Sequence, residues 1–176
     1  MKNTRTLRRL TEGAMIAAIY AVLTFLLWQF SSLQIQVRVS EALCILPLFT
    51  PSAVPGLTLG CLLANLLGGN NLWDMIFGSL ATLLASLVTY YIGKKGKGKW
   101  VKWIAPLPSV VFNALIIPFV LYFGYGFTSF GDIEGMWIVL GLDALSVAIG
   151  QITACYGLGL PLYAMLKRIK FFAEKE

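Results

Sequence analysis

Residues 37–71, VRVSEALCILPLFTPSAVPGLTLGCLLANLLGGNN, set the architecture expected for the chain and indicate where it acts. The stretch is apolar enough to lie in a lipid bilayer, yet it opens with Arg38 and Glu41 and contains three prolines. A charge inside hydrocarbon costs about 2.5–3.5 kcal/mol on insertion scales, so such a charge indicates a functional site. Prolines make the backbone irregular, which is tolerated at membrane depth where protein or a water-filled cavity surrounds it. The stretch therefore predicts a binding cavity near one membrane face.

The rest of the chain has the composition of an integral membrane protein. Of its 176 residues, 58% are hydrophobic and 12% are charged, and the mean hydropathy is +0.78. Because a helical crossing needs about 20 apolar residues, the length allows one transmembrane domain over residues 1–176 and no soluble domain. The net charge of +6 does not indicate nucleic-acid binding, because the basic residues lie at the edges of apolar runs, where they set topology.

Three basic clusters predict the topology. They are the amino terminus, the loop KKGKGKWVK at residues 94–102 and the tail that begins with KRIK at residue 167, and they hold every basic residue except Arg38. The positive-inside rule places all three in the cytoplasm. An even number of crossings must then separate the first cluster from the second, so the apolar run 41–68 contributes two crossings or none. Two short helices fit best, although a re-entrant hairpin satisfies the same parity.

These arguments predict an all-α integral membrane protein built as a bundle of six transmembrane helices with both termini cytoplasmic. We expect it in the bacterial cytoplasmic membrane, as a multi-pass protein. The expected helices lie at approximately 12–30, 38–50, 54–68, 73–93, 104–127 and 137–166.

Polar residues in and around residues 37–71 are the candidate substrate ligands. Amide and carboxylate groups can bind the donor and acceptor edge of a planar heterocycle, and an indole can stack on its face. Structural alternatives stay open: Arg38 and Glu41 could pair with each other at i, i+3, and Trp73 could be an interfacial aromatic. The last two helices add polar groups that could be ligands or could join helices within the bundle. The candidates are Arg38, Glu41, Asn65, Asn71, Trp73, Asp74, Asn113, Asp143 and Gln151.

Several kinds of chemistry are missing from the sequence. There is no histidine, the three cysteines lie in apolar runs without CxxC spacing, and no phosphate-binding loop or HExxH motif occurs. We can assemble no catalytic pair, and we expect no metal and no cofactor. If the predicted cavity serves uptake, uptake requires an energy source. The chain has neither an ATPase nor the inverted repeat of about twelve helices typical of secondary transporters, so we expect it to work as one subunit among several.

The first helix carries small residues at i, i+4 spacing on two adjoining rows, Ala14 with Ala18 and Ala17 with Ala21. Such a face lets another helix backbone approach closely in lipid. The pattern predicts either packing within the bundle or a docking face for a partner subunit.

The block VRVSEALCILPLFTPSAVPGLTLGCLLANLLGG, followed by DMIFGSLATLLASLVTYYIGKK, APLPSVVFNALIIP and ALSVAIGQITACYGLGLPLY, resembles the QueT family. These are predicted queuosine-precursor transporters, the substrate-binding S components of energy-coupling factor (ECF) transporters. The resemblance covers nearly the whole chain. It implies a six-helix bundle of the S-component type that captures substrate on the outer side and pairs with a transmembrane coupling subunit and two cytoplasmic ATPases. It also implies that an AxxxA pattern is the docking face, here Ala14 and Ala18 with Ala17 and Ala21 beside them.

The substrate implied by the resemblance is a 7-deazaguanine such as 7-aminomethyl-7-deazaguanine. A guanine-like edge offers adjacent N–H donors, which Glu41 could accept in a bidentate manner, while Asp74 or Asp143 could bind an aminomethyl cation. The family often has a carboxylate at the position of Gln151, so this chain departs from the pattern there. The alternatives are an S component for another vitamin or purine-like compound and, in a different class, a small membrane enzyme or structural subunit.

Overall fold

The computed structural model describes residues 2–27, 38–96, 98–125 and 135–168. These residues form helices and turns and contain no strand, so the predicted all-helical class is confirmed. Four helical stretches are long and apolar enough to cross a membrane: Thr4–Leu26, Leu72–Lys95, Val101–Gly124 and Met136–Arg168. Two apolar helices, Val39–Leu48 and Ala53–Leu67, are shorter. The fold is thus that of a helical membrane protein.

The chain begins with α1 (Lys2–Leu26), followed by the 3₁₀ helix η1 (Val39–Leu48), α3 (Ala53–Leu67) and α4 (Leu72–Lys95). The short helix α5 (Val101–Ile104) leads into α6 (Leu107–Val120), which ends in the π-helical turn η2 (Leu121–Tyr125). The last stretch is one continuous rod of α7 (Met136–Ile152), the π-helical segment η3 (Thr153–Leu158) and α8 (Gly159–Arg168).

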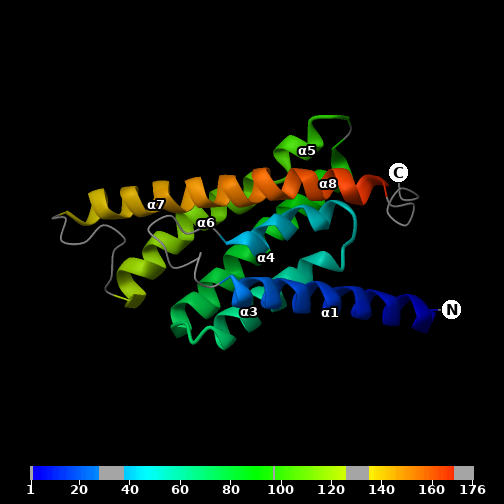
Figure 1. Ribbon diagram of the computed structural model, residues 1–176, viewed down its shortest axis with the longest axis horizontal. Helices are drawn as coiled ribbons and strands as arrows, with labels where there is room; N and C mark the ends of the chain where they lie inside the picture. The colour runs from blue at the N-terminus through cyan, green and yellow to red at the C-terminus, as the bar shows by residue number, and fades with distance from the viewer. Residues whose placement is uncertain (1, 28–37, 97, 126–134, 169–176) are drawn as a thin grey trace.

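The helices run back and forth between two ends of the molecule (Figure 1). The amino-terminal part of α1 and the ends of α4 and α8 lie towards one end, α5 and the start of η1 lie nearer the middle, and the α3–α4 turn lies towards the other end. The last turns of α4 and α8 carry Lys94, Lys95, Lys167 and Arg168, and α5 carries Lys102. The basic residues in the last turns of α4 and α8 therefore lie towards one end, as the positive-inside argument requires.

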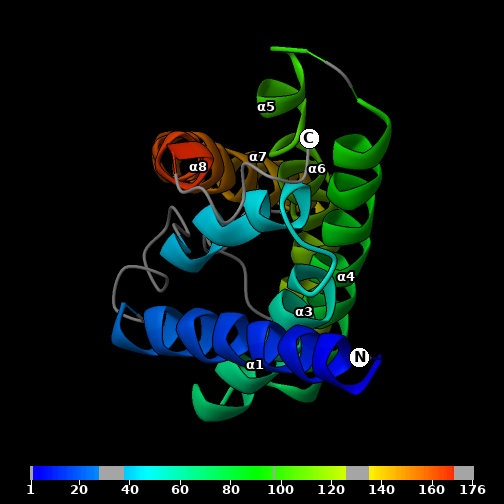
Figure 2. The ribbon, with the colours of Figure 1, turned by 90° about the vertical axis from the view of Figure 1, so that its right-hand side faces the viewer.

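The irregular segment η1 lies inside the bundle, between α1 and the α7–α8 rod (Figure 2). Its residues from Ser40 to Pro47 are all buried, against α1, α4, η3 and α8. Pro47 has no N–H to donate, which disfavours a regular α-helix here. At about 2.0 Å of rise per residue, a 3₁₀ helix of ten residues is about 20 Å long, shorter than the hydrocarbon core of about 30 Å. This proline-containing segment is therefore enclosed by protein.

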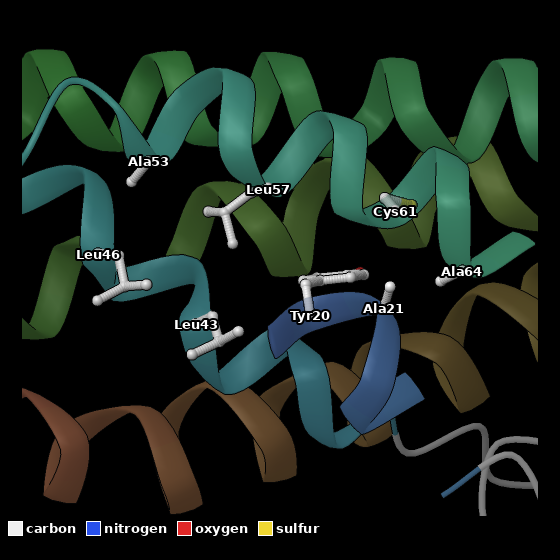
Figure 3. Close-up of a cluster of buried hydrophobic side chains, with 8 residues drawn as sticks. All are labelled: Tyr20, Ala21, Leu43, Leu46, Ala53, Leu57, Cys61 and Ala64. Atoms are coloured by element: carbon white, nitrogen blue, oxygen red, sulfur yellow. The ribbon is translucent and has the colours of Figure 1, made fainter. Parts of the chain in front are cut away.

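Helices α1 and α3 pack with their backbones almost in contact. A Cβ atom added at Gly60 would lie 2.7 Å from the Tyr20 Cβ and 2.9 Å from the Ala17 carbonyl oxygen. One added at Gly56 would lie 2.8 Å from the Gly13 carbonyl oxygen. The interface continues into a cluster of buried side chains from α1, η1 and α3 (Figure 3): Tyr20, Ala21, Leu43, Leu46, Ala53, Leu57, Cys61 and Ala64.

This packing separates the two rows of small residues on α1. Ala17 and Ala21 are buried inside the bundle, whereas Ala14 and Ala18 are exposed. Small residues let helices approach closely, and one row does so within this chain. The other row is left facing outward.

We expect Gly60→Ala to destabilise the protein by about 1–3 kcal/mol, because the added methyl group overpacks the α1–α3 interface. Thermal unfolding of the purified protein in detergent measures the effect. Gly141→Ala is the matched control, since a Cβ there meets no atom within 4 Å. Equal unfolding temperatures for the two variants would contradict the close α1–α3 contact.

Candidate binding site

The carboxylate of Glu41 is at the centre of a buried polar group near the start of η1. Its residue is 2% exposed, and the Tyr20 hydroxyl of α1 donates a hydrogen bond of 2.6 Å to Oε1. Among the described residues, no hydrogen-bond donor contacts Oε2. A carboxylate can accept several hydrogen bonds, and α1 fixes one of the two Glu41 oxygens.

Arg38 binds Asp74 of α4, with 3.5 Å between Nη2 and Oδ2. The sequence spacing allowed a pair between Arg38 and Glu41, but the ion pair in the structure joins residues 36 positions apart. Asp74 lies in the first turn of α4, where the helix dipole favours a carboxylate. The ion pair therefore fixes the start of η1 to the start of α4, and leaves Glu41 without a direct salt bridge among the described residues.

Asn65 fixes the turn between α3 and α4. Its side chain is buried, and Nδ2 donates to the backbone oxygen of Asp74 at 3.1 Å. Asn70 donates to Oδ1 of Asn65 at 2.9 Å. The turn also needs Gly69, whose φ of 67° lies in the left-handed region. Both ends of the Asn65 amide are thus used to hold this turn beside Asp74.

Asn71 and Trp73 lie at the start of α4, next to η2. Asn71 Nδ2 donates to the Gly124 oxygen at 2.6 Å. Trp73 is 52% exposed and stacks on Phe77 with ring centroids 5.6 Å apart. These contacts fit the interfacial alternative for Trp73, and they join α4 to the end of α6.

Gln151 approaches the Glu41 segment from α7. Gln151 is buried, and the Cys155 thiol lies 3.5 Å from both the Gln151 Oε1 and the Glu41 backbone oxygen. Cys155 belongs to η3, and π-helical turns occur frequently at functional sites. The site therefore draws on α1, η1, α4 and the α7–η3 rod.

Asn113 and Asp143 belong to α6 and α7, which pack together. Asn113 Nδ2 donates to the Ser109 oxygen of its own helix at 2.9 Å. Asp143 is completely buried. The three buried acids of the described residues are therefore Glu41, Asp74 and Asp143.

Four residues at this site were not predicted from the sequence: Tyr20, Thr24, Ser40 and Cys155. Thr24 donates to the Ser40 hydroxyl at 2.7 Å, one turn along α1 from the Tyr20–Glu41 bond. A signal was present, since Tyr20 and Thr24 follow Ala17 at helical spacing on the face that now proves buried. Polar groups on the packing row of an apolar helix need partners inside the bundle.

The arrangement is suited to binding a small polar ligand. It combines a buried carboxylate with a neighbouring ion pair, and carboxylates accept paired N–H donors from planar groups. Among the described residues, no group of three or more His, Cys, Asp or Glu side chains is placed to hold a metal ion.

A model of the family described as QueT transporter matches residues 10–168. No curated protein and no solved structure matches the chain.

Proposed function

Because the chain belongs to the QueT transporter family, we propose that it is the substrate-capturing S component of an ATP-driven ECF transporter. The substrate we propose is a queuosine precursor, a 7-deazaguanine such as 7-aminomethyl-7-deazaguanine. Membership in a transporter family, together with helices long and apolar enough to cross a membrane, supports transport as the activity.

The observation that carries the substrate proposal is the environment of Glu41. Tyr20 holds Oε1, which leaves Oε2 and the remaining lone pair of Oε1 to accept the adjacent N–H donors of a guanine-like edge. Water is excluded from a residue that is 2% exposed, so these hydrogen bonds discriminate strongly between ligands. An aminomethyl cation needs a second acid, for which Asp74 and Asp143 are buried candidates. Gln151 and Arg38 complete the proposed polar lining beside Glu41. We propose that Asn65, Asn71 and Asn113 position the helices around the site through their bonds to backbone oxygens, and that Trp73 stacks on the ligand.

We propose six membrane crossings with both ends in the cytoplasm, in the bacterial cytoplasmic membrane. The position of the described basic residues towards one end supports this orientation. We propose that Glu41 receives its ligand from the outer side. Helices η1 and α3 form the two short crossings. A bilayer adapts to short crossings by local thinning at a modest cost.

The proposed partners are a transmembrane coupling subunit and two cytoplasmic ATPases. The exposed row of Ala14 and Ala18 on α1 supports a docking face for the coupling subunit. Ala17 and Ala21 are buried against the bundle, so their packing holds α1 in place with the Ala14 and Ala18 face outward.

Uptake of a labelled 7-deazaguanine by cells tests the proposal. Cells that express the chain together with an ECF coupling subunit and its ATPases should accumulate the label, and cells that express the chain alone should not. Accumulation by the chain alone would contradict the dependence on a partner. If the complete complex accumulates a different vitamin and no deazaguanine, the substrate assignment is wrong.

A further inference from the structure

Helix α1 carries two features on adjoining faces within two turns of each other. One is the exposed pair Ala14 and Ala18, and the other is the pair of buried hydroxyl groups on Tyr20 and Thr24. The hydroxyl groups bond the first turn of η1, which contains Glu41. The proposed docking face and the proposed ligand carboxylate are therefore connected through a single rigid helix.

Tyr20 is closely packed between α1, η1 and α3. The residue is 1% exposed, and its ring belongs to the cluster formed by α1, η1 and α3 (Figure 3). The backbone of Gly60 lies directly against the Tyr20 Cβ. Because close-packed side chains have few alternative rotamers, a shift of the Glu41 carboxylate is passed to the helix.

The contacts between α1 and η1 lie on both sides of the alanine pair. Towards the amino terminus of α1, Glu12 Oε2 accepts a hydrogen bond of 3.0 Å from Thr50, which follows η1. Towards its carboxy terminus lie the bonds of Tyr20 to Glu41 at 2.6 Å and of Thr24 to Ser40 at 2.7 Å. Helix α1 is thus attached to both ends of η1. Of these three hydrogen bonds, only the one from Tyr20 is made to Glu41, the proposed ligand carboxylate.

We propose that Tyr20 couples occupancy of the Glu41 site to docking on the Ala14/Ala18 face of α1. The inference rests on the proposed function and adds to it a residue that transmits between the two sites. A ligand that donates a hydrogen bond to Oε2 shifts the position of the carboxylate, and the Tyr20 hydroxyl on Oε1 follows. Tyr20 is therefore a positioning residue, and ligand binding and docking affect each other reciprocally.

The test measures how tightly the chain, in nanodiscs, binds the complex of the coupling subunit and its ATPases. The dissociation constant is determined with and without saturating 7-aminomethyl-7-deazaguanine. For the wild type, we expect the two dissociation constants to differ by about fivefold or more, the lower range of measured allosteric couplings. Tyr20→Phe removes the hydroxyl and keeps the ring. We expect it to bring the ratio of these two dissociation constants below about twofold. We also expect it to weaken ligand binding by the isolated chain by about tenfold, because the hydroxyl no longer orients the Glu41 carboxylate for the ligand.

Thr24→Val is the matched control. It removes a hydroxyl from the same face of α1 and breaks a bond to the same turn of η1, but this bond does not involve Glu41. We expect the wild-type ratio to persist in Thr24→Val. Comparison of thermal unfolding in the two variants separates coupling from loss of stability.

Three results would overturn the inference. The first is a wild-type ratio close to one, and the second is a Tyr20→Phe ratio equal to that of the wild type. The third is an equal loss of coupling in Tyr20→Phe and Thr24→Val, which indicates only general loosening of α1. If the wild-type chain binds no deazaguanine, the proposed substrate is wrong, and the inference fails together with it.

Discussion

Glu41→Gln is expected to weaken binding of 7-deazaguanines by at least about 100-fold. The substitution keeps the size of the side chain but replaces a charged acceptor pair with one carbonyl and one NH₂ group, which faces the ligand's own donors. Hydrogen bonds to a charged group contribute about 1.5–3 kcal/mol each. In the variant one of them is replaced by two opposed donors, and the other becomes a weaker bond to a neutral carbonyl. Every 1.4 kcal/mol changes affinity about tenfold. Isothermal titration of the purified protein measures the change.

Glu12→Gln is the control for this experiment. It makes the same chemical change on α1, where the Glu12 carboxylate bonds Arg8 and Thr50 instead of lying in the candidate site. Its affinity for the ligand should stay within about twofold of wild type. If Glu41→Gln binds as tightly as wild type, Glu41 is not the ligand carboxylate.

The double variant Ala14→Trp, Ala18→Trp is expected to abolish co-purification with the coupling subunit. Both residues are exposed on one face of α1. Two indole groups at these positions prevent the backbone of a partner helix from approaching as closely as the small alanine side chains allow. Because neither side chain faces the bundle, the isolated variant should fold and bind its ligand with nearly wild-type affinity. Affinity pull-down and titration measure the two properties separately.

Met15→Trp, Ile19→Trp is the matched control for docking. The two residues have the same spacing on the same helix and are 60% and 48% exposed, but they are already large. This variant should co-purify with the coupling subunit normally. If both double variants lose the partner, α1 is sensitive to any added bulk and the alanine face has no special role. If only the alanine variant fails to fold, Ala14 and Ala18 pack within the protein.

The sequence predicts the all-helical class, because hydropathy and the length of apolar runs are properties of local composition. Helices η1 and α3 lie where the parity of the basic clusters requires a segment that turns back. The 3₁₀ form of η1 and its position at the centre of the bundle are harder to predict from the sequence. Three prolines between residues 47 and 55 indicate an irregular backbone, but the geometry depends on packing against helices far away in the chain.

The hydrogen-bond and ion-pair partners in the site could not be predicted from the sequence. The i, i+3 spacing of Arg38 and Glu41 allows a local pair, but Arg38 binds Asp74 on another helix. Glu41 binds Tyr20 from yet another helix. Which partner is chosen depends on how neighbouring helices are rotated, and spacing within one segment contains no information about that rotation.

The rows of small residues on α1 show the same limit. Both rows have i, i+4 spacing, so the pattern alone does not say which one packs inside. The glycines of α3 decide it, because Gly56 and Gly60 bring the α3 backbone against Gly13 and Ala17. The exposed row is then Ala14 and Ala18.

The most direct test of the account is a titration of the purified wild-type chain with two ligands that differ in one group. One is 7-aminomethyl-7-deazaguanine, and the other is its counterpart without the 2-amino group, which removes one of the two N–H donors proposed to bind Glu41. We predict saturable binding of the first and at least about 100-fold weaker binding of the second, because a buried site built for a hydrogen bond rejects analogues that lack it. Equal affinity for the two compounds, or no binding of either, would contradict the proposal that Glu41 recognises a guanine-like edge.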